Sequence, residues 1–249
     1  MGKEPYIVIK NEEVPIKAVI FDIGNTLFNA TGLLHEAIKK STGELYKRGS
    51  IANETEFIKT YMEIDKLIQG PHINHLFSDL SICKRVWEKL DLKGSYSDIG
   101  FFLTNLRNNV RKGIRRNEQL VDIIRTLNNK GLKIAIVSDG TTNEQIETLT
   151  NLGIVKFFDV IVISEEYNLE KPDPILFEHA LFQMGVKPKE SLMVGDDPIR
   201  DIEGAKKLGI YTIITTQYST RSNQKRGLKA DFKIENLKEV LLIIKTGVI

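Results

Sequence analysis

Acidic and hydroxyl side chains stand directly after three apolar runs of this sequence, where they could bind a cation or act as nucleophiles. The run VIF precedes Asp22, the run IAIV precedes Ser138 and Asp139, and the run MVG precedes Asp196 and Asp197. Carboxylates are hard oxygen ligands for cations, and a carboxylate can also form a covalent intermediate with a substrate. These residues form a reactive site if the fold brings the ends of the three runs together.

The elements that position these residues are predicted to be alternating strands and helices. From residue 117 onward, short apolar runs alternate with longer segments of helical periodicity, which is typical of right-handed crossovers in a parallel sheet. In such sheets the binding crevice lies beyond the carboxyl ends of the strands. The predicted fold class is therefore α/β, a Rossmann-like parallel-sheet core with helices on both faces and the polar residues at one edge.

The segment from about 30 to 112 has a different pattern, with helical periodicity, polar breaks and no strong β run. It predicts an α-helical domain of residues 30–112, inserted into an α/β core formed by residues 1–29 and 113–249. Trp87 in this insert is expected to belong to its hydrophobic core. Near the end of the sequence, the run ENLKEVLLIIK at 235–245 predicts a closing amphipathic helix.

Each candidate residue also has a purely structural interpretation. An aspartate after a strand often caps the next helix, and Ser138 could form a turn. Lys171, in the run EKPDP, could be a solvated lysine in a loop fixed by proline. Alone, none of these residues indicates a function, whereas their order along the chain is more specific.

That order resembles the haloacid dehalogenase-like (HAD) hydrolase superfamily, most of whose members are magnesium-dependent phosphatases. The run VIFDIGNTL is similar to the first motif of the family, IAIVSDG to the second, Lys171 in EKPDP to the third, and MVGDDPIRDIEGAKKLG to the fourth. The resemblance covers residues 16 to about 216. It implies a phosphatase of a small phosphomonoester, with the helical insert as a mobile cap over the core.

The resemblance also implies a role for residues of the first three motifs. Asp22 would attack phosphorus and form an aspartyl phosphate that water later hydrolyses. Ser138, with backbone amides near Asp139 and Gly140, would bind the phosphoryl oxygens, and Lys171 would compensate negative charge on the nucleophile and the phosphate. The catalytic residues are then Asp22, Ser138 and Lys171, and the substrate-binding groups come from 138–140 and Lys171.

A magnesium ion is the cofactor that the resemblance implies. Several carboxylates beside a dianionic phosphate would repel it, so this cluster needs a cation, and hard oxygen ligands suit Mg²⁺. The resemblance assigns Asp22, Asp196 and Asp201 as side-chain ligands and Gly24 as a ligand through its backbone carbonyl. A glycine keeps that carbonyl, so magnesium binding is expected to survive at this position.

Gly24 is where the sequence departs from the family pattern. The family usually has a second aspartate there, which protonates the leaving oxygen and then activates water. Neither Gly24 nor Asn25 can serve as a general acid, and loss of such a group costs about 10² to 10⁴ in rate. Other proton donors are Asp139, metal-bound water, the substrate itself, or a histidine of the insert, which contains His35, His72 and His75.

Two other functions stay open at this point. The 2-haloacid dehalogenases also lack the second aspartate, because their nucleophile attacks carbon and the halide leaves without a proton. They dispense with magnesium and generally lack an aspartate at the position of Asp196, which this sequence keeps. The second alternative is a non-catalytic descendant that binds a phosphorylated metabolite.

Composition limits the partners that can be expected. The formal charge is +2 over 249 residues, so no strong field for nucleic acid is implied. No apolar run approaches the roughly 20 residues that span a bilayer, and Cys83 is the only cysteine, which excludes an internal disulfide. We expect a cytoplasmic monomer or homodimer that binds a small phosphorylated metabolite and neither nucleic acid nor membrane.

Overall fold

The chain divides into two compact units. The computed structural model describes residues 4–68, 78–93, 96–218 and 229–245. One unit comprises Met1–Ala30 and Arg116–Ile249, and the other comprises Thr31–Arg115; we call them the α/β unit and the helical unit. Among the described residues, none of the helices has the length and apolar character needed to cross a membrane.

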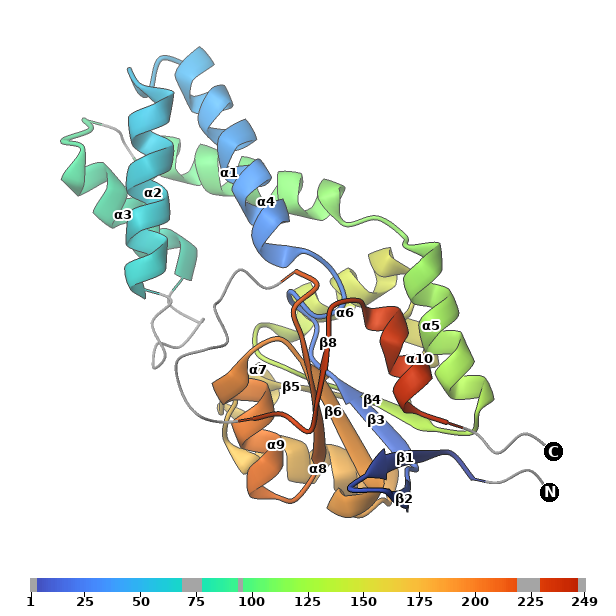
Figure 1. Ribbon diagram of the computed structural model, residues 1–249. Helices are drawn as coiled ribbons and strands as arrows, with labels where there is room; N and C mark the ends of the chain where they lie inside the picture. The colour runs from blue at the N-terminus through green and yellow to red at the C-terminus, as the bar shows by residue number, and fades with distance from the viewer. Residues whose placement is uncertain (1–3, 69–77, 94–95, 219–228, 246–249) are drawn as a thin grey trace. The chain divides into compact units, whose positions relative to one another are not determined.

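The α/β unit is built on a six-stranded sheet with the strand order β5-β4-β3-β6-β7-β8 (Figure 1). Every neighbouring pair in this sheet is parallel. The strands are β3 (Ala18–Phe21), β4 (Lys133–Ser138), β5 (Val160–Ile163), β6 (Ser191–Gly195), β7 (Tyr211–Thr215) and β8 (Phe232–Ile234). Because the chain adds strands on one side of β3 and then returns to its other side, the topological switch point lies at β3 and β6.

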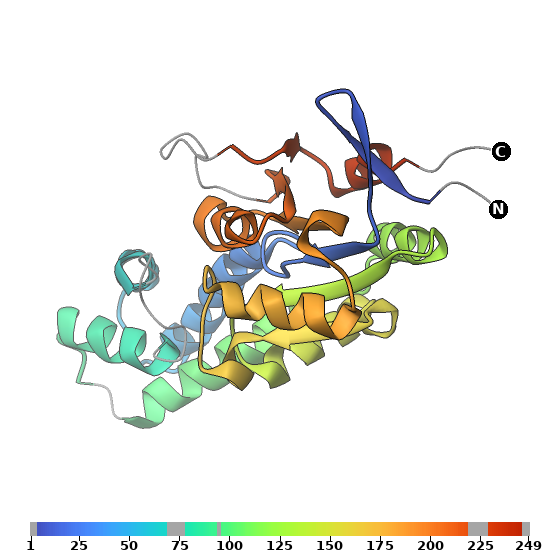
Figure 2. The ribbon, with the colours of Figure 1, turned by 90° about the horizontal axis from the view of Figure 1, so that it is seen from below.

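The helices of this unit lie on both sides of the sheet (Figure 2). They are α5 (Glu118–Asn129), α6 (Thr142–Leu152), α7 (Ser164–Tyr167), α8 (Pro174–Met184), α9 (Gly204–Lys207) and α10 (Val240–Ile243), with a π-helical segment η4 (Pro198–Glu203) before α9. The bounds of α8 follow from its sequence: Asp173 caps the first turn, Pro174 opens the helix and Gly185 ends it with φ 64°. The predicted α/β class is confirmed.

Alternate residues of the central strands form the core of the sheet. Ala18 and Ile20 of β3 share one apolar cluster with Ala135 and Val137 of β4 and with Phe177 of α8. All four residues of β3 are buried, as expected for a strand with both faces covered. The central strand is therefore a rigid support for the residue that follows it.

A β-hairpin precedes the sheet. It consists of β1 (Tyr6–Ile9) and β2 (Glu12–Pro15), and its two turn residues, Lys10 and Asn11, have φ of 48° and 66°. Positive φ at both positions is typical of the type I′ turn that matches the twist of two paired strands. Tyr6 also exchanges two backbone hydrogen bonds of 2.9 Å with Lys245.

The helical unit has its own hydrophobic core. Its helices are α1 (Ala30–Lys47), α2 (Glu54–Ile68), α3 (Ser78–Lys89) and α4 (Tyr96–Gly113). Phe57, Trp87 and Phe102 are buried together, and the rings of Phe57 and Trp87 meet edge to face with centroids 5.2 Å apart. The expected core position of Trp87 is confirmed.

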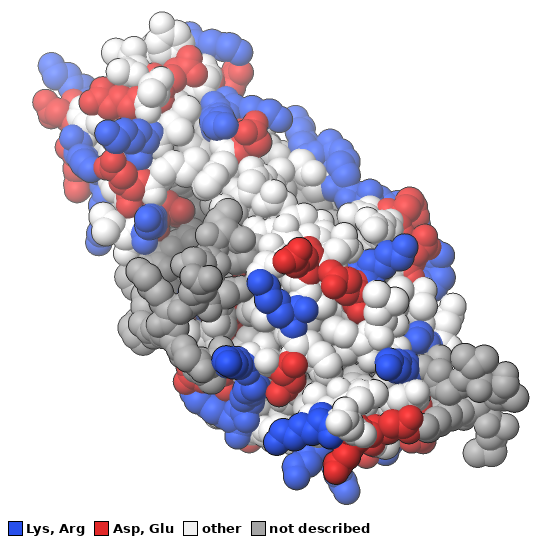
Figure 3. Space-filling view, viewed as in Figure 1, with Lys and Arg blue, Asp and Glu red and all other residues white. Residues whose placement is uncertain are grey.

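Charged side chains of both signs are interspersed over the described part of the face that Figure 3 shows. Short ion pairs also occur within α1, such as Lys39 with Glu36 at 3.0 Å and Lys47 with Glu44 at 2.9 Å. Exposed pairs of this kind contribute about 0 to 1 kcal/mol each. On this face, the described residues do not form a continuous field of one sign.

Candidate active site

The three central strands end at the residues that the sequence singled out. Asp22 follows β3, Ser138 is the last residue of β4, and Asp196 follows β6. Lys171 comes from the segment between α7 and α8, and Asp201 comes from η4. The chain therefore brings these residues to the carboxyl edge of the sheet at its switch point, where ligands bind in open α/β folds.

Asp22 is held by hydrogen bonds to both of its carboxylate oxygens. Its Oδ1 accepts from Lys171 Nζ at 2.6 Å and lies 3.5 Å from Ser138 Oγ, and its Oδ2 accepts from Thr26 Oγ1 at 2.9 Å. Asn25 has φ 54°, a left-handed conformation that asparagine tolerates better than most residues. The loop thus turns back and aims the Thr26 hydroxyl at the aspartate.

Lys171 is the buried cation of the site. Its ammonium contacts Asp22 Oδ1 at 2.6 Å and Asp201 Oδ1 at 2.7 Å. Burial alone would lower the pKa of Lys171, but the carboxylates of Asp201 and Asp22 outweigh it and hold that pKa above the ordinary lysine value. The lysine is therefore charged at neutral pH and compensates two carboxylates.

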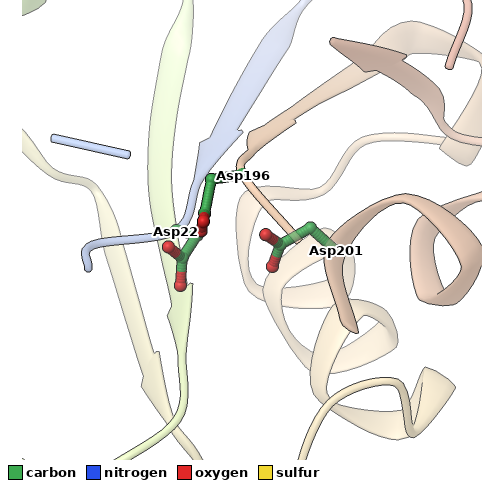
Figure 4. Close-up of side chains that lie close together, drawn as sticks. All are labelled: Asp22, Asp196 and Asp201. Atoms are coloured by element: carbon green, nitrogen blue, oxygen red, sulfur yellow. The ribbon is translucent and has the colours of Figure 1, made fainter. Parts of the chain in front are cut away.

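Three buried carboxylates lie around this cation, so their negative charge exceeds its positive charge. Ligand oxygens of Asp22, Asp196 and Asp201 all lie within 4.8 Å of one another, and Figure 4 shows Asp22 and Asp196 side by side at the strand ends with Asp201 facing them. Burial raises the pKa of Asp201 well above its ordinary value; Lys171 lowers it, but the charges of Asp22 and Asp196 raise it further. This concentration of negative charge and hard oxygen donors fits a divalent cation such as Mg²⁺.

Asp201 packs tightly beneath the loop after β6. Its Oδ2 accepts from the backbone N–H of Asp197 at 2.9 Å. Asp197 in turn caps η4, since its side chain accepts from the backbone of Ile199 and Arg200. A Cβ atom at Gly195 would lie only 2.2 Å from Asp201 Oδ2, so the glycine is what lets the carboxylate approach the backbone.

Gly195→Ala is therefore expected to damage both stability and the site. The added methyl group must displace Asp201 and break its contact with Lys171, and overpacking of this kind typically costs about 1 to 3 kcal/mol of unfolding free energy. Urea unfolding measures the loss. Gly100→Ala is the control, because it adds a methyl group with no neighbour within 4 Å. Since Gly100 lies within α4, this substitution should raise stability by up to about 1 kcal/mol. Equal stability of Gly195→Ala and Gly100→Ala would contradict this view.

The loop after β4 is fixed by contacts within the α/β unit. The backbone N–H of Gly140 donates to Ser164 Oγ at 3.0 Å, and Gln145 Nε2 donates to the carbonyl of Asp139 at 2.9 Å. The Gly140 amide would have to leave Ser164 to bind a phosphoryl oxygen. The Asp139 side chain accepts from the backbone of Lys171, a contact that the sequence did not reveal.

Gly24 is not required by the backbone conformation. It is absent from the positive-φ glycines of the described residues, and a Cβ atom there would meet only Ala30 Cβ, at an ordinary contact distance of 3.6 Å. A larger residue therefore fits sterically at its first carbon. Of the histidines considered as replacement proton donors, His35 is exposed on α1, and His72 and His75 lie outside the described residues.

Comparisons with known proteins identify the family of this chain. A family model described as haloacid dehalogenase-like hydrolase matches residues 19–215. A glyceraldehyde 3-phosphate phosphatase of Methanocaldococcus jannaschii is 30% identical over 92% of this chain and 97% of its own length. An enzyme of the same name from Methanothermobacter thermautotrophicus is 32% identical over 91% of this chain and 100% of its own.

Solved structures share the fold. A putative β-phosphoglucomutase of Thermotoga maritima has a TM-score of 0.72 at 20% identity, covering 92% of this chain and 98% of that one. A putative HAD hydrolase of Bacillus subtilis, described as bound to magnesium, has a TM-score of 0.71 at 15% identity, covering 90% and 96%. With the family match and the two phosphatase relatives, these findings show that the chain belongs to the haloacid dehalogenase-like hydrolases.

Proposed function

We propose that this protein is a magnesium-dependent phosphatase that acts on a small phosphorylated metabolite through an aspartyl phosphate on Asp22. The observation that carries the proposal is the setting of Asp22. Its carboxylate lies at the end of the central strand, beside the Lys171 ammonium and the Ser138 hydroxyl and within the carboxylate cluster. Phosphoryl transfer depends on such alignment and charge compensation.

The proposed reaction has two steps. In the first, an Asp22 oxygen attacks phosphorus, the bond from phosphorus to the leaving oxygen breaks, and the leaving group takes the electron pair. In the second, water attacks phosphorus, the Asp22 carboxylate leaves, and inorganic phosphate is released. Lys171 and Ser138 compensate the charge of the transferring group in both steps, and Thr26 keeps the nucleophile oriented.

The metal would be held by Asp22, Asp196 and Asp201, with the backbone carbonyl of Gly24 as a further ligand. When bound, magnesium supplies charge neutralisation for the phosphate among these carboxylates. Asp201 would contribute partly through its charge, since its two oxygens already accept from Lys171 Nζ and the Asp197 N–H.

Gly24 bears on which substrates react best. An alkyl phosphate expels an alkoxide, which needs a proton, whereas aryl and acyl phosphates expel stable anions that do not. With no acid at Gly24, we infer a preference for good leaving groups. Two compounds to test first follow from the names of relatives. A triose phosphate is suggested by the glyceraldehyde 3-phosphate phosphatases. Pyrophosphate is suggested by the pyrophosphatase PpaX of Halalkalibacterium halodurans, which is 25% identical. The helical unit would act as the cap that selects among them.

The test is a substrate panel assayed with Mg²⁺ and with EDTA. The panel contains acetyl phosphate, p-nitrophenyl phosphate, glyceraldehyde 3-phosphate, pyrophosphate and 2-chloropropionate. We expect phosphate release only with Mg²⁺, fastest from the acyl and aryl compounds. Chloride release in EDTA without any phosphate release would establish a haloacid dehalogenase instead. Binding of a phosphorylated compound without turnover of any would establish the non-catalytic alternative.

A further inference from the structure

The Asp139 carboxylate joins two loops of the candidate site. Asp139 directly follows Ser138 at the end of β4, and its Oδ1 accepts from the backbone N–H of Lys171 at 2.9 Å. The side chain of that lysine reaches Asp22 and Asp201. One carboxylate thus connects the loop that carries the hydroxyl to the loop that carries the ammonium.

The backbone at Lys171 has no regular secondary structure to fix it. It lies between α7, which ends at Tyr167, and α8, which begins at Pro174. A backbone N–H in such a segment lacks a helical or sheet partner, and Asp139 supplies the acceptor. The lysine itself has four rotatable bonds, so the position of its ammonium depends on where its backbone is held.

The other oxygen of Asp139 has a charged partner. Asp139 Oδ2 forms a long ion pair with Arg200 Nη1 at 3.8 Å. The two oxygens of the carboxylate therefore have partners on different segments, Oδ1 on the loop of Lys171 and Oδ2 on η4. These contacts fix the position of the Asp139 side chain.

We propose that Asp139 is a positioning residue of the reaction. Its hydrogen bond holds the Lys171 backbone where the lysine ammonium can contact Asp22 and Asp201. This role rests on the proposed phosphatase function. Asp139 acts through Lys171, from whose backbone N–H it accepts, and not by direct contact with the substrate. Loss of the bond should let the ammonium move away from the transferring phosphoryl group.

The test compares Asp139→Ala, which removes the acceptor, with Asp139→Asn, which keeps an acceptor oxygen. Asp159→Ala is the matched control, because Asp159 Oδ2 also accepts from a backbone N–H, that of Ile134 at 2.7 Å, near the other end of β4. With p-nitrophenyl phosphate and Mg²⁺, Asp139→Ala should lower kcat about tenfold or more and change KM less than about threefold, since misplacement of a catalytic group acts on the chemical step. The kcat of Asp139→Asn should be at least about threefold higher than that of Asp139→Ala. Asp159→Ala should keep the wild-type kcat.

A second measurement does not depend on turnover. In a spectrum of ¹⁵N-labelled lysine side chains, the buried Lys171 ammonium should give a slowly exchanging signal, which Lys171→Arg identifies by its loss. That signal should shift or broaden in Asp139→Ala and stay unchanged in Asp159→Ala. An unchanged signal in Asp139→Ala, equal kcat losses in the Ala variant and the control, or no recovery in Asp139→Asn would overturn the proposal. A wild-type protein without phosphatase activity would overturn the proposed function alone, because the ammonium signal still reports the positioning.

Discussion

Asp22→Asn is expected to lower the phosphatase rate by about 10⁴-fold or more, as removal of a nucleophile does in other hydrolases. An amide cannot form the aspartyl phosphate, and the substitution also removes a charge that pairs with Lys171. The side chain keeps its size, and Lys171 keeps Asp201 as a partner, so the fold should persist. Initial rates with p-nitrophenyl phosphate and Mg²⁺ measure the loss of activity. Circular dichroism of the same samples shows whether the fold persists.

Asp122→Asn provides the control for this substitution. Asp122 is an exposed aspartate of α5 that pairs with Arg125, so its replacement removes one carboxylate without touching the site. It should leave the rate unchanged. If Asp22→Asn keeps a rate within about tenfold of wild type, the covalent mechanism is wrong.

Gly24→Asp is expected to raise the rate on alkyl phosphates by about 10² to 10⁴, the usual contribution of general acid catalysis. The new carboxyl group would stand two residues after Asp22, and in its protonated form it could donate a proton to a departing alkoxide. The first carbon of its side chain fits, since only Ala30 Cβ lies near, at 3.6 Å. Aryl phosphates should gain less, because phenolate leaves without a proton. The ratio of kcat/KM for glycerol phosphate and p-nitrophenyl phosphate measures the difference.

Gly24→Asn separates acid catalysis from the effect of adding a side chain. It has the same shape as the aspartate variant but no proton to give, so it should show no gain on either substrate class. Urea unfolding and Mg²⁺ titration of both variants establish that the fold and metal affinity are kept. If both variants have the same rates, Gly24 is not a missing acid and another group already supplies the proton.

The residues at the strand ends could be predicted because parallel strands impose a common edge. The alternation of strands and helices predicts that Asp22, Ser138 and Asp196 lie at the same edge of the sheet. Their proximity follows from the strand order β4-β3-β6, which the structure supplies. The fold class followed from the same alternation. The metal ligands and catalytic roles stay predictions, which the substitutions at Asp22 and Gly24 test.

The contacts that orient these residues could not be predicted, because they depend on loop conformation. The Thr26 hydroxyl reaches Asp22 only because Asn25 adopts a left-handed conformation. In place of one helix over 235–245, the chain forms a short 3₁₀ turn, Leu237–Glu239, followed by the single turn of α10, Val240–Ile243. It ends at Ile244 because Lys245 pairs with Tyr6 of the hairpin, and such a long-range pairing overrides local helix propensity.

The division of the α/β unit into two chain segments has a consequence for folding during synthesis. The first core strand, β3, pairs with β4 and β6, both of which are translated only after the whole helical unit. That unit has a separate apolar core, so it can fold on the ribosome while β3, with its four apolar residues, still lacks its neighbours. Pairing across so long a loop is slow. A nascent chain would therefore expose this strand for the time needed to translate the insert, and we expect it to be a binding site for chaperones.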